Sequence, residues 1–221
     1  MVLVMNKKIK KIIKMCYRFV SYIPFVNFYC CIHNHLKFGQ KALFNCRIVC
    51  HGKNNYIILR GLGTIKNTNI VIYGNNNTID IGENSSLNKG DICIENDNNT
   101  LLIGNNSVLC GETHIAVIEG TKVIIGDNCM LSSKIVFRTG DSHSVIDING
   151  NRINPSKNIT IGDHVWIGQD VKILKGVNIS NDTVIGTGSI VTKSFFESNL
   201  IIAGNPASIK KYNINWLKER I

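Results

Sequence analysis

The chain has 221 residues and a formal net charge of +10, which divides unevenly along its length. Residues 1–79 contain 12 Lys and Arg and no Asp or Glu, whereas residues 80–221 contain 13 basic and 15 acidic residues. This cationic first third favours an anionic membrane or a polyanionic substrate. Nucleic acid is disfavoured, because no recognisable nucleic-acid-binding module combines the basic residues with aromatic ones. Eight cysteines without a CxxC pair do not resemble a metal site and are typical of reduced thiols in the cytoplasm.

The first 40 residues differ in composition from the rest. Between Lys7 and Arg18 basic residues alternate with isoleucines, which predicts a basic amphipathic helix. We expect a helical region over residues 1–40 that caps the domain behind it, makes peripheral contact with a membrane, or does both. The absence of a small-residue cleavage site disfavours a signal peptide. A transmembrane span is disfavoured by the polar residues of the uncharged stretch that follows: Ser21, Pro24, Asn27, His33, Asn34 and His35.

Two series of residues recur every 22 positions in the middle of the chain. Ile-Gly pairs begin at Ile81, Ile103 and Ile125, and Leu59 lies one period earlier. The second series is polar: Asn55, Asn77, Asn99 and Thr121. The isoleucine anchors are followed by Gly-Glu-Asn, Gly-Asn-Asn and Gly-Asp-Asn, in which Gly and Asn accept the positive φ of tight corners. Two independent series with one period predict a structural repeat.

A shorter period begins at Ile161, after which an aliphatic residue returns at every sixth position: Ile161, Ile167, Ile173, Ile179, Ile185 and Val191. Six residues match neither a helix nor a simple alternating strand. We expect an all-β solenoid, a parallel β-helix of triangular cross-section in which each hexapeptide forms one short strand and one corner. It is expected over residues 41–203, followed by a tail with a short C-terminal helix over residues 204–221. Compact residues lie four positions after Ile81, Ile103, Ile125 and Ile161. We expect their side chains inside the solenoid: Ser85, Ser107, Cys129 and Val165.

The step from Ile125 to Ile161 is 36 residues rather than 22, so extra residues interrupt the regular coil. We expect a loop over residues 138–157 that is functional rather than disordered. It carries His143, with Asp141 and Asp147 two and four residues away, where a carboxylate can hold one tautomer of a general base. A solvated loop histidine is the alternative. The loop also has apolar residues, which we expect to anchor it: Val145, Ile146, Ile148 and Ile153.

Two further residues stand out against the repeat. His164 takes a corner position, and we expect it to be a turn residue like its counterparts Asn84, Asn106 and Asn128. Trp166 takes an outward position, where earlier coils have Ser86, Val108 and Met130. An exposed indole indicates contact with a ligand, with the loop or with a neighbouring subunit, and a purely structural role is the alternative.

Three segments resemble the hexapeptide-repeat O-acetyltransferases, a family that includes the maltose, galactoside and polysaccharide acetyltransferases. They are IGDHVWIG from Ile161, IGTGSIVTK from Ile185 and AGNPASIKK from Ala203. The Asp-Ser-His loop and the basic N-terminus are most similar to the bacterial capsule and sialic-acid O-acetyltransferases. The resemblance implies a left-handed β-helix that assembles as a homotrimer, with active sites between subunits and acetyl-CoA along the C-terminal coils.

The resemblance also implies roles for individual residues. His143 matches the family's base, which takes the proton from an acceptor hydroxyl, and Trp166 matches a tryptophan that lines the acetyl site. Lys210 and Lys211 are expected to compensate for Ser208, which stands where a basic residue often binds the nucleotide phosphates. Thr187 replaces a commoner alanine. The positions that contact coenzyme A correspond to Gln169, Thr187, Thr192, Lys193 and Lys211.

These observations predict an enzyme that moves an acetyl group from acetyl-CoA to a hydroxyl of a cell-surface glycan, with sialic acid of a capsular polysaccharide as the acceptor. Transfer is expected to be direct, with the oxyanion held by a backbone N–H near Gly168 or by the Trp166 indole. An acetyltransferase for a neutral sugar or lipopolysaccharide unit and a non-catalytic glycan-binding solenoid are the alternatives. Zinc chemistry of the carbonic anhydrase type is disfavoured, because position 148 is Ile rather than a metal-binding His, and no metal is expected. The expected location is the cytoplasm or the inner face of the bacterial membrane.

Overall fold

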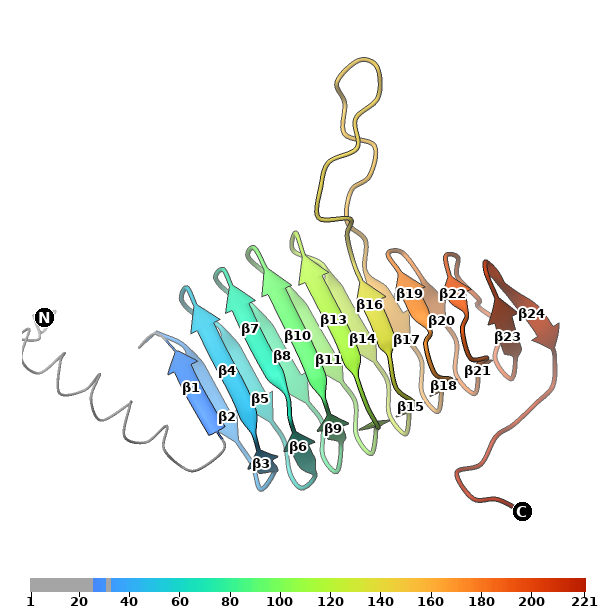
Figure 1. The fold of residues 1–221 in the computed structure, drawn as a ribbon, viewed down its shortest axis with the longest axis horizontal. Coiled ribbons are helices and arrows are strands. Elements are labelled where there is room, and N and C mark those ends of the chain that lie inside the picture. The colour runs from blue at the N-terminus through green and yellow to red at the C-terminus, as the bar shows by residue number, and fades with distance from the viewer. Residues whose placement is uncertain (1–25, 31–32) are drawn as a thin grey trace, which may run out of the picture.

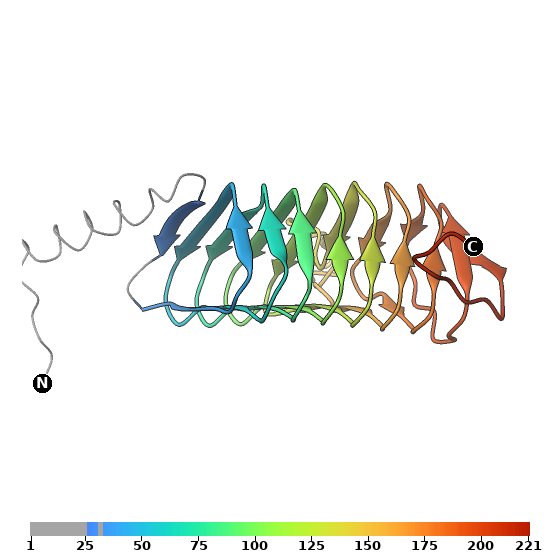
Figure 2. The same ribbon diagram turned by 90° about the horizontal axis from the view of Figure 1, so that it is seen from below.

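The computed structural model describes residues 26–30 and 33–221 of the protein. The described chain winds into a parallel β-solenoid with three sheets, named here A, B and C, that run along its length (Figure 1, Figure 2). From β1 to β22 successive strands enter sheets A, B and C in turn, and β23 and β24 then both join sheet C. The predicted all-β parallel solenoid is therefore confirmed.

The strands are short throughout. Sheet A contains β1 (Val26–Cys30), β4 (Cys46–His51), β7 (Asn69–Tyr73), β10 (Gly90–Glu95), β13 (Thr113–Ile118), β16 (Ile135–Arg138), β19 (Lys172–Leu174) and β22 (Ile190–Val191). Sheet B contains β2 (His35–Phe38), β5 (Tyr56–Leu59), β8 (Thr78–Ile81), β11 (Thr100–Ile103), β14 (Lys122–Ile125), β17 (Ile159–Ile161) and β20 (Asn178–Ile179). Sheet C contains β3 (Ala42–Phe44), β6 (Thr64–Lys66), β9 (Ser86–Asn88), β12 (Val108–Leu109), β15 (Met130–Leu131), β18 (Trp166–Ile167), β21 (Val184–Ile185), β23 (Ile201–Gly204) and β24 (Ala207–Lys211).

The aliphatic anchors stack into rows inside the solenoid. Ile81 pairs with Ile103 across a step of 22 residues, Ile125 with Ile161 across 36, and Ile161 with Ile179 across 18. All of these side chains are at most 2% exposed. Burial of each contributes about 1.5–3 kcal/mol, so the row is a large part of what holds successive coils together. The compact residues expected inside are also buried: Ser85, Ser107, Cys129 and Val165.

The polar series forms a buried ladder at the edge between sheets A and B. Oδ1 of Asn55 accepts the backbone N–H of Asn77 at 2.9 Å, and Oδ1 of Asn77 accepts that of Asn99 at 2.8 Å. Asn99 in turn accepts the N–H of Thr121 at 3.1 Å, and the Thr121 hydroxyl donates to that of Thr139 at 2.7 Å. Because a buried polar group without a partner is costly, the ladder fixes the register of this edge.

The corners use left-handed backbone, as the sequence predicts. His164 has a φ of 53°. Its counterparts in earlier coils have values of 55°, 55° and 57°, and they are Asn84, Asn106 and Asn128. The prediction that His164 is a turn residue is confirmed, since Asn and His are among the residues that tolerate this region best.

The helices predicted at the two ends are not found in the described residues. Ala207–Lys211 forms β24, antiparallel to β23, and the rest of the segment 204–221 contains no helix, so the predicted C-terminal helix is wrong. The helical region predicted over residues 1–40 is wrong where it is described, because β1 and β2 are strands. The remainder, with the basic segment expected to contact a membrane, lies outside the described residues. Within the described part, no helix has the length and apolar character of a membrane span.

Candidate active site

The His143 loop, residues 139–158, leaves the solenoid between β16 and β17, where sheet A meets sheet B. Figure 1 shows it standing away from the coils as two long arms joined at a tip. An antiparallel bridge joins Ile146 to Arg152 near that tip. The Asp147 carboxylate accepts the backbone N–H groups of Asn149 at 2.8 Å and Asn151 at 2.9 Å, and these bonds, that of Asn151 first, lower the pKa of Asp147. Asp147 therefore stabilises the turn at the tip of the loop.

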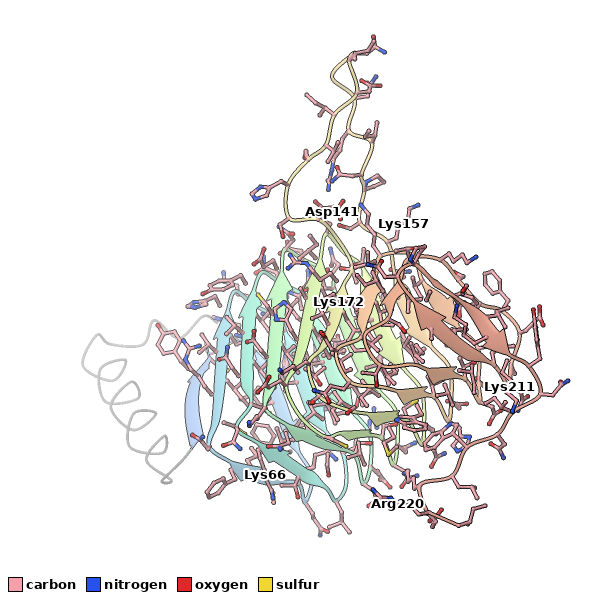
Figure 3. The ribbon with its side chains drawn as sticks, turned by 45° about the vertical axis from the view of Figure 1, so that its right-hand side comes forward. Lys66, Asp141, Lys157, Lys172, Lys211 and Arg220 are labelled. Atoms are coloured by element: carbon pink, nitrogen blue, oxygen red, sulfur yellow. The ribbon has the colours of Figure 1, made fainter. Side chains whose placement is uncertain are left out.

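Two ion pairs hold this loop to the coils on either side. Asp141, at the foot of the loop in Figure 3, pairs with Lys175, which follows β19. On the other arm, Arg152 donates to Glu119, which follows β13, at 2.8 Å. The hydrogen bond from Lys175 lowers the pKa of Asp141, and that from Arg152 lowers the pKa of Glu119. Both carboxylates are therefore charged at neutral pH, and each belongs to an ion pair between the loop and the solenoid.

His143 lies on the first arm with an exposed side chain. Neither Asp141 nor Asp147 holds its imidazole, so that prediction is wrong: the first carboxylate is bound to Lys175 and the second to the tip. Among the described residues the ring has no hydrogen-bond partner, and only the backbone carbonyl of His143 is held, by Nδ2 of Asn154 at 2.8 Å. The imidazole is thus presented on a supported backbone with both ring nitrogens open to a substrate or to another subunit.

The apolar residues of the loop do not anchor it to its own solenoid. They are exposed by half or more, up to the fully exposed Ile148, and the others are Val145, Ile146 and Ile153. The ion pairs of Asp141 and Arg152 provide the anchoring that was expected from these side chains. A cluster of exposed aliphatic residues is typical of a surface that another polypeptide covers.

Trp166 lies in β18 with its indole on the outside of sheet C, 38% exposed, as predicted. Its ring tilts against that of Trp216, with centroids 6.0 Å apart. Trp216 is buried, stacks on the His164 ring at 4.3 Å and donates from Nε1 to the His164 carbonyl at 2.8 Å. Asp182 holds Nδ1 of His164 at 2.8 Å. The C-terminal tail therefore packs beside Trp166, a neighbour that sequence analysis missed although a tryptophan in a polar tail is a signal for docking.

The two expected oxyanion donors differ in availability. The backbone N–H of Gly168 itself donates to the carbonyl of Ile185 at 2.8 Å, as part of the bonding between coils, and a neighbouring backbone N–H stays a prediction. The indole N–H of Trp166 has no acceptor among the described residues.

The positions matched to coenzyme A contacts lie at three places on the C-terminal coils. Gln169 and Thr187 lie one above the other, at the corner where sheet C passes into sheet A. Thr192 and Lys193 follow β22 at the other end of sheet A, and Lys211 ends β24. All five side chains are exposed. Nζ of Lys210 donates to Oγ of Ser208 at 3.0 Å, which brings a positive charge to the position where the family often has a basic residue.

The described cysteines offer no activated thiol near this loop. Burial raises the pKa of Cys129 to about 11, and burial likewise raises that of Cys93 to about 11, so both stay protonated at neutral pH. No disulfide joins Cys46 to Cys50. In the part of the chain that the structure describes, no group of three or more His, Cys, Asp or Glu residues could hold a metal ion.

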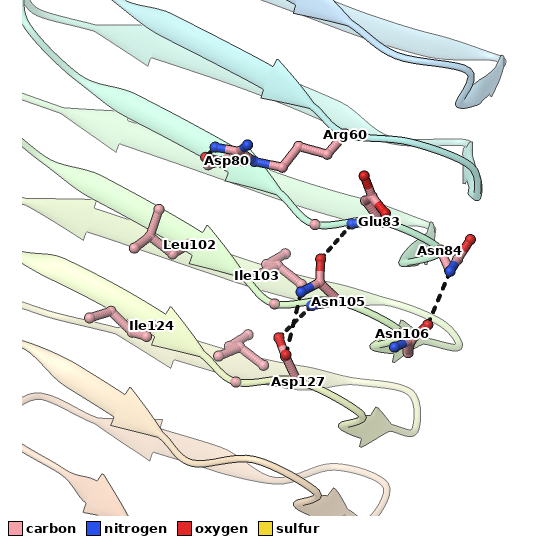
Figure 4. A pocket seen from close by; sticks show the side chains of 14 residues that line it. Arg60, Asp80, Glu83, Asn84, Leu102, Ile103, Asn105, Asn106, Ile124 and Asp127 are labelled. Atoms are coloured by element: carbon pink, nitrogen blue, oxygen red, sulfur yellow. Dashed lines mark hydrogen bonds and ion pairs between the residues drawn. The ribbon is translucent and has the colours of Figure 1, made fainter.

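A hollow in the described surface lies elsewhere, over sheet B and its corner with sheet C. This groove of about 770 Å³ carries the ion pair of Arg60 with Asp80, 2.6 Å long (Figure 4). Its amides and carboxylates already bond between coils, for example Asp127 Oδ1 to the N–H of Asn105 at 2.6 Å. Because these groups stabilise the solenoid and the groove contains neither His143 nor Trp166, we do not assign it as the active site.

Comparison with known proteins finds similar chains among the O-acetyltransferases. The solved polysialic acid O-acetyltransferase OatWY is 34% identical and superimposes with a TM-score of 0.82 over 89% of this chain and 92% of that one. The polysialic acid-specific acetyltransferase NeuO is 32% identical, with a TM-score of 0.81 over 88% of both chains. The polysialic acid O-acetyltransferase of Escherichia coli O1:K1 is 38% identical over 103 residues, which are 46% of this chain and 33% of that protein.

The matched stretches span about a third to a half of the curated relatives, and no family model matches the chain. The solved structures, in contrast, correspond to it over nearly their whole length. On the strength of that shared fold and sequence, the chain belongs to the hexapeptide-repeat acetyltransferases.

Proposed function

We propose that this protein transfers an acetyl group from acetyl-CoA to a hydroxyl of an acidic cell-surface glycan, with sialic acid of a capsular polysaccharide as the acceptor. The observation that carries the proposal is the His143 loop, which presents an unpaired imidazole beside a solenoid similar over almost its full length to two polysialic acid acetyltransferases. The described residues 26–79 contain six basic and no acidic side chains, and this charge suits a polyanionic acceptor. The free thiols suit a cytoplasmic enzyme.

The chemistry follows from the groups available. A sugar hydroxyl is a poor nucleophile at neutral pH, and the His143 imidazole takes its proton as the oxygen attacks the thioester carbonyl of acetyl-CoA. The tetrahedral oxyanion accepts a hydrogen bond from the indole N–H of Trp166. When the carbon–sulfur bond breaks, the imidazolium returns the proton to the departing thiolate. Acetyl-CoA would lie along the C-terminal coils, held by Gln169, Thr187, Thr192, Lys193 and Lys211.

A single chain does not bring His143 and Trp166 together, which supports a site shared between subunits. The His143 loop stands out from the edge between sheets A and B, and Trp166 lies on sheet C, the face opposite that edge (Figure 1). A homotrimer in which the loop of one subunit reaches sheet C of the next would solve this separation. It would also cover the exposed Ile146, Ile148 and Ile153, whose burial favours association.

The proposal is tested by measuring release of free coenzyme A from acetyl-CoA, with sialic-acid polymers, neutral sugars or no acceptor. His143→Ala should lower turnover with the acidic glycan about 10²–10⁴-fold. His114→Ala is the matched control, because His114 lies on the outer face of β13, paired with Asp91 at 2.9 Å, and not in the loop. Turnover confined to neutral sugars would overturn the acidic acceptor. If the protein binds the glycan but releases no coenzyme A with any acceptor, it is a glycan-binding solenoid instead.

A further inference from the structure

Asn154 joins the two arms of the His143 loop around the histidine itself. Its Nδ2 donates to the backbone carbonyl of His143 at 2.8 Å and to the Asp141 carboxylate at 2.9 Å. Its Oδ1 accepts the backbone N–H of Val145 at 2.7 Å. The side chain therefore holds the backbone immediately before and after Ser144, on the arm that carries the imidazole.

The chemistry of these partners requires an amide. The carbonyl of His143 can only accept a hydrogen bond and the N–H of Val145 can only donate one, so the orientation of the amide follows from its neighbours. A carboxylate at this position would lose both donors and place a second negative charge beside Asp141. An aliphatic side chain would lose these three bonds and a fourth, from Nε of Arg152 to Oδ1 at 3.3 Å.

Asn154 also connects the histidine to the rigid part of the molecule. Asp141, which accepts from Asn154, is ion-paired with Lys175 at the end of β19, and Lys175 donates to the backbone carbonyl of Asn154 at 3.2 Å. The position of His143 is thus determined by a chain of contacts that ends in the solenoid, although its ring touches none of them.

We infer that Asn154 is the positioning residue of the catalytic histidine, an inference that rests on the proposed acetyl transfer by His143. Asn154→Ala should lower kcat about 10–100-fold with the KM for acetyl-CoA unchanged, since displacement of a catalytic group by about 1 Å has an effect of this size. Asn154→Asp should show a similar loss of kcat, because a carboxylate lacks the two N–H donors. The amide of Val145 should lose its protection from hydrogen exchange. Asn149→Ala is the matched control, because Asn149 is in the same loop and only its backbone N–H is bonded.

A double-mutant cycle separates positioning from a general effect on folding. In a His143→Ala background, Asn154→Ala should change the residual rate by less than about twofold, because residues that act as one unit are strongly non-additive. A wild-type rate in Asn154→Ala, or the same loss in both backgrounds, would overturn the inference. Absence of turnover in the wild-type protein would instead refute the proposed function.

Discussion

Replacement of Lys175 by methionine should release the His143 loop without unfolding the solenoid. The substitution keeps most of the aliphatic stem and removes the ion pair with Asp141 and the hydrogen bond to the Asn154 carbonyl. A hydrogen bond to a charged group contributes about 1.5–3 kcal/mol, and exposure of the Asp141 side chain, 46%, reduces this through solvent screening. A loss of about 1–2 kcal/mol remains, which raises the open population of the loop roughly 5–30-fold.

Hydrogen exchange followed by mass spectrometry measures this directly. Peptides from the loop should exchange roughly 5–30-fold faster in Lys175→Met than in the wild-type protein. The kcat for acetyl transfer should fall, because His143 is less often held in place. Peptides from the buried strands β13 and β17 should not change. Lys172→Met is the matched control, because Lys172 lies on the same strand and pairs only with Asp170, at 3.0 Å. Equal exchange of the loop in Lys175→Met and in the wild-type protein would refute the anchoring role.

Acid should release the loop in the same way. Lys175 lowers the pKa of Asp141, and Arg152 lowers that of Glu119, so both anchors are strongest above the ordinary carboxyl pKa of about 4. Their contribution is lost as the pH falls through the lowered values. Loop exchange, corrected for its intrinsic pH dependence, should therefore rise below about pH 4. In Asp141→Asn, the part of this rise that depends on Asp141 should be absent; a rise of full size in that variant would contradict the assignment.

Three further predictions concern the catalytic histidine, the C-terminal tail and the buried asparagine ladder. His143→Ala should lower kcat about 10²–10⁴-fold in the coenzyme A release assay, and a far smaller loss would exclude it as the base. Trp216→Ala should lower the rate while leaving the melting temperature of the solenoid within a few degrees, as calorimetry can show; an unchanged rate would mean that the tail does not support Trp166. Asn77→Ala should destabilise the fold by about 2–4 kcal/mol in urea unfolding, because the N–H of Asn99 loses its buried acceptor, whereas a loss under about 1 kcal/mol would contradict the ladder's role.

Periodicity in the sequence predicts the core because stacked coils repeat their requirements. Ile103 and Asn99 each face an identical neighbour one coil away, so the same residue type is needed at a fixed interval. The corner residue His164 and the outward Trp166 follow from the same alignment. These features depend on local spacing alone, and all of them are found in the structure.

The surroundings of His143 could not be predicted in this way, because they come from distant parts of the chain. Asp141 looks like a partner for His143 in the sequence, yet it is bound to Lys175, 34 residues away. The register that pairs Val136 with Lys172 places Lys175 beside residue 139, where the loop begins. The 36-residue step from Ile125 to Ile161 gives that register, but the path of the loop that brings Asp141 to Lys175 follows no repeat. The terminal strand β24 was missed for a similar reason, since its partner β23 offers an unpaired edge only in the assembled sheet.

The change of coil length along the solenoid has a consequence for engineering. In sheet B the step between paired residues is 21 or 22 before the loop and 18 after it, and strands pair with those of the adjacent coils. A duplicated 22-residue unit inserted before Asn99 would continue both the isoleucine row and the asparagine ladder, because both have this step there. Each inserted coil would move the N-terminal end of the solenoid about 4.8 Å further from the His143 loop. The distance between the two could therefore be set by the number of coils.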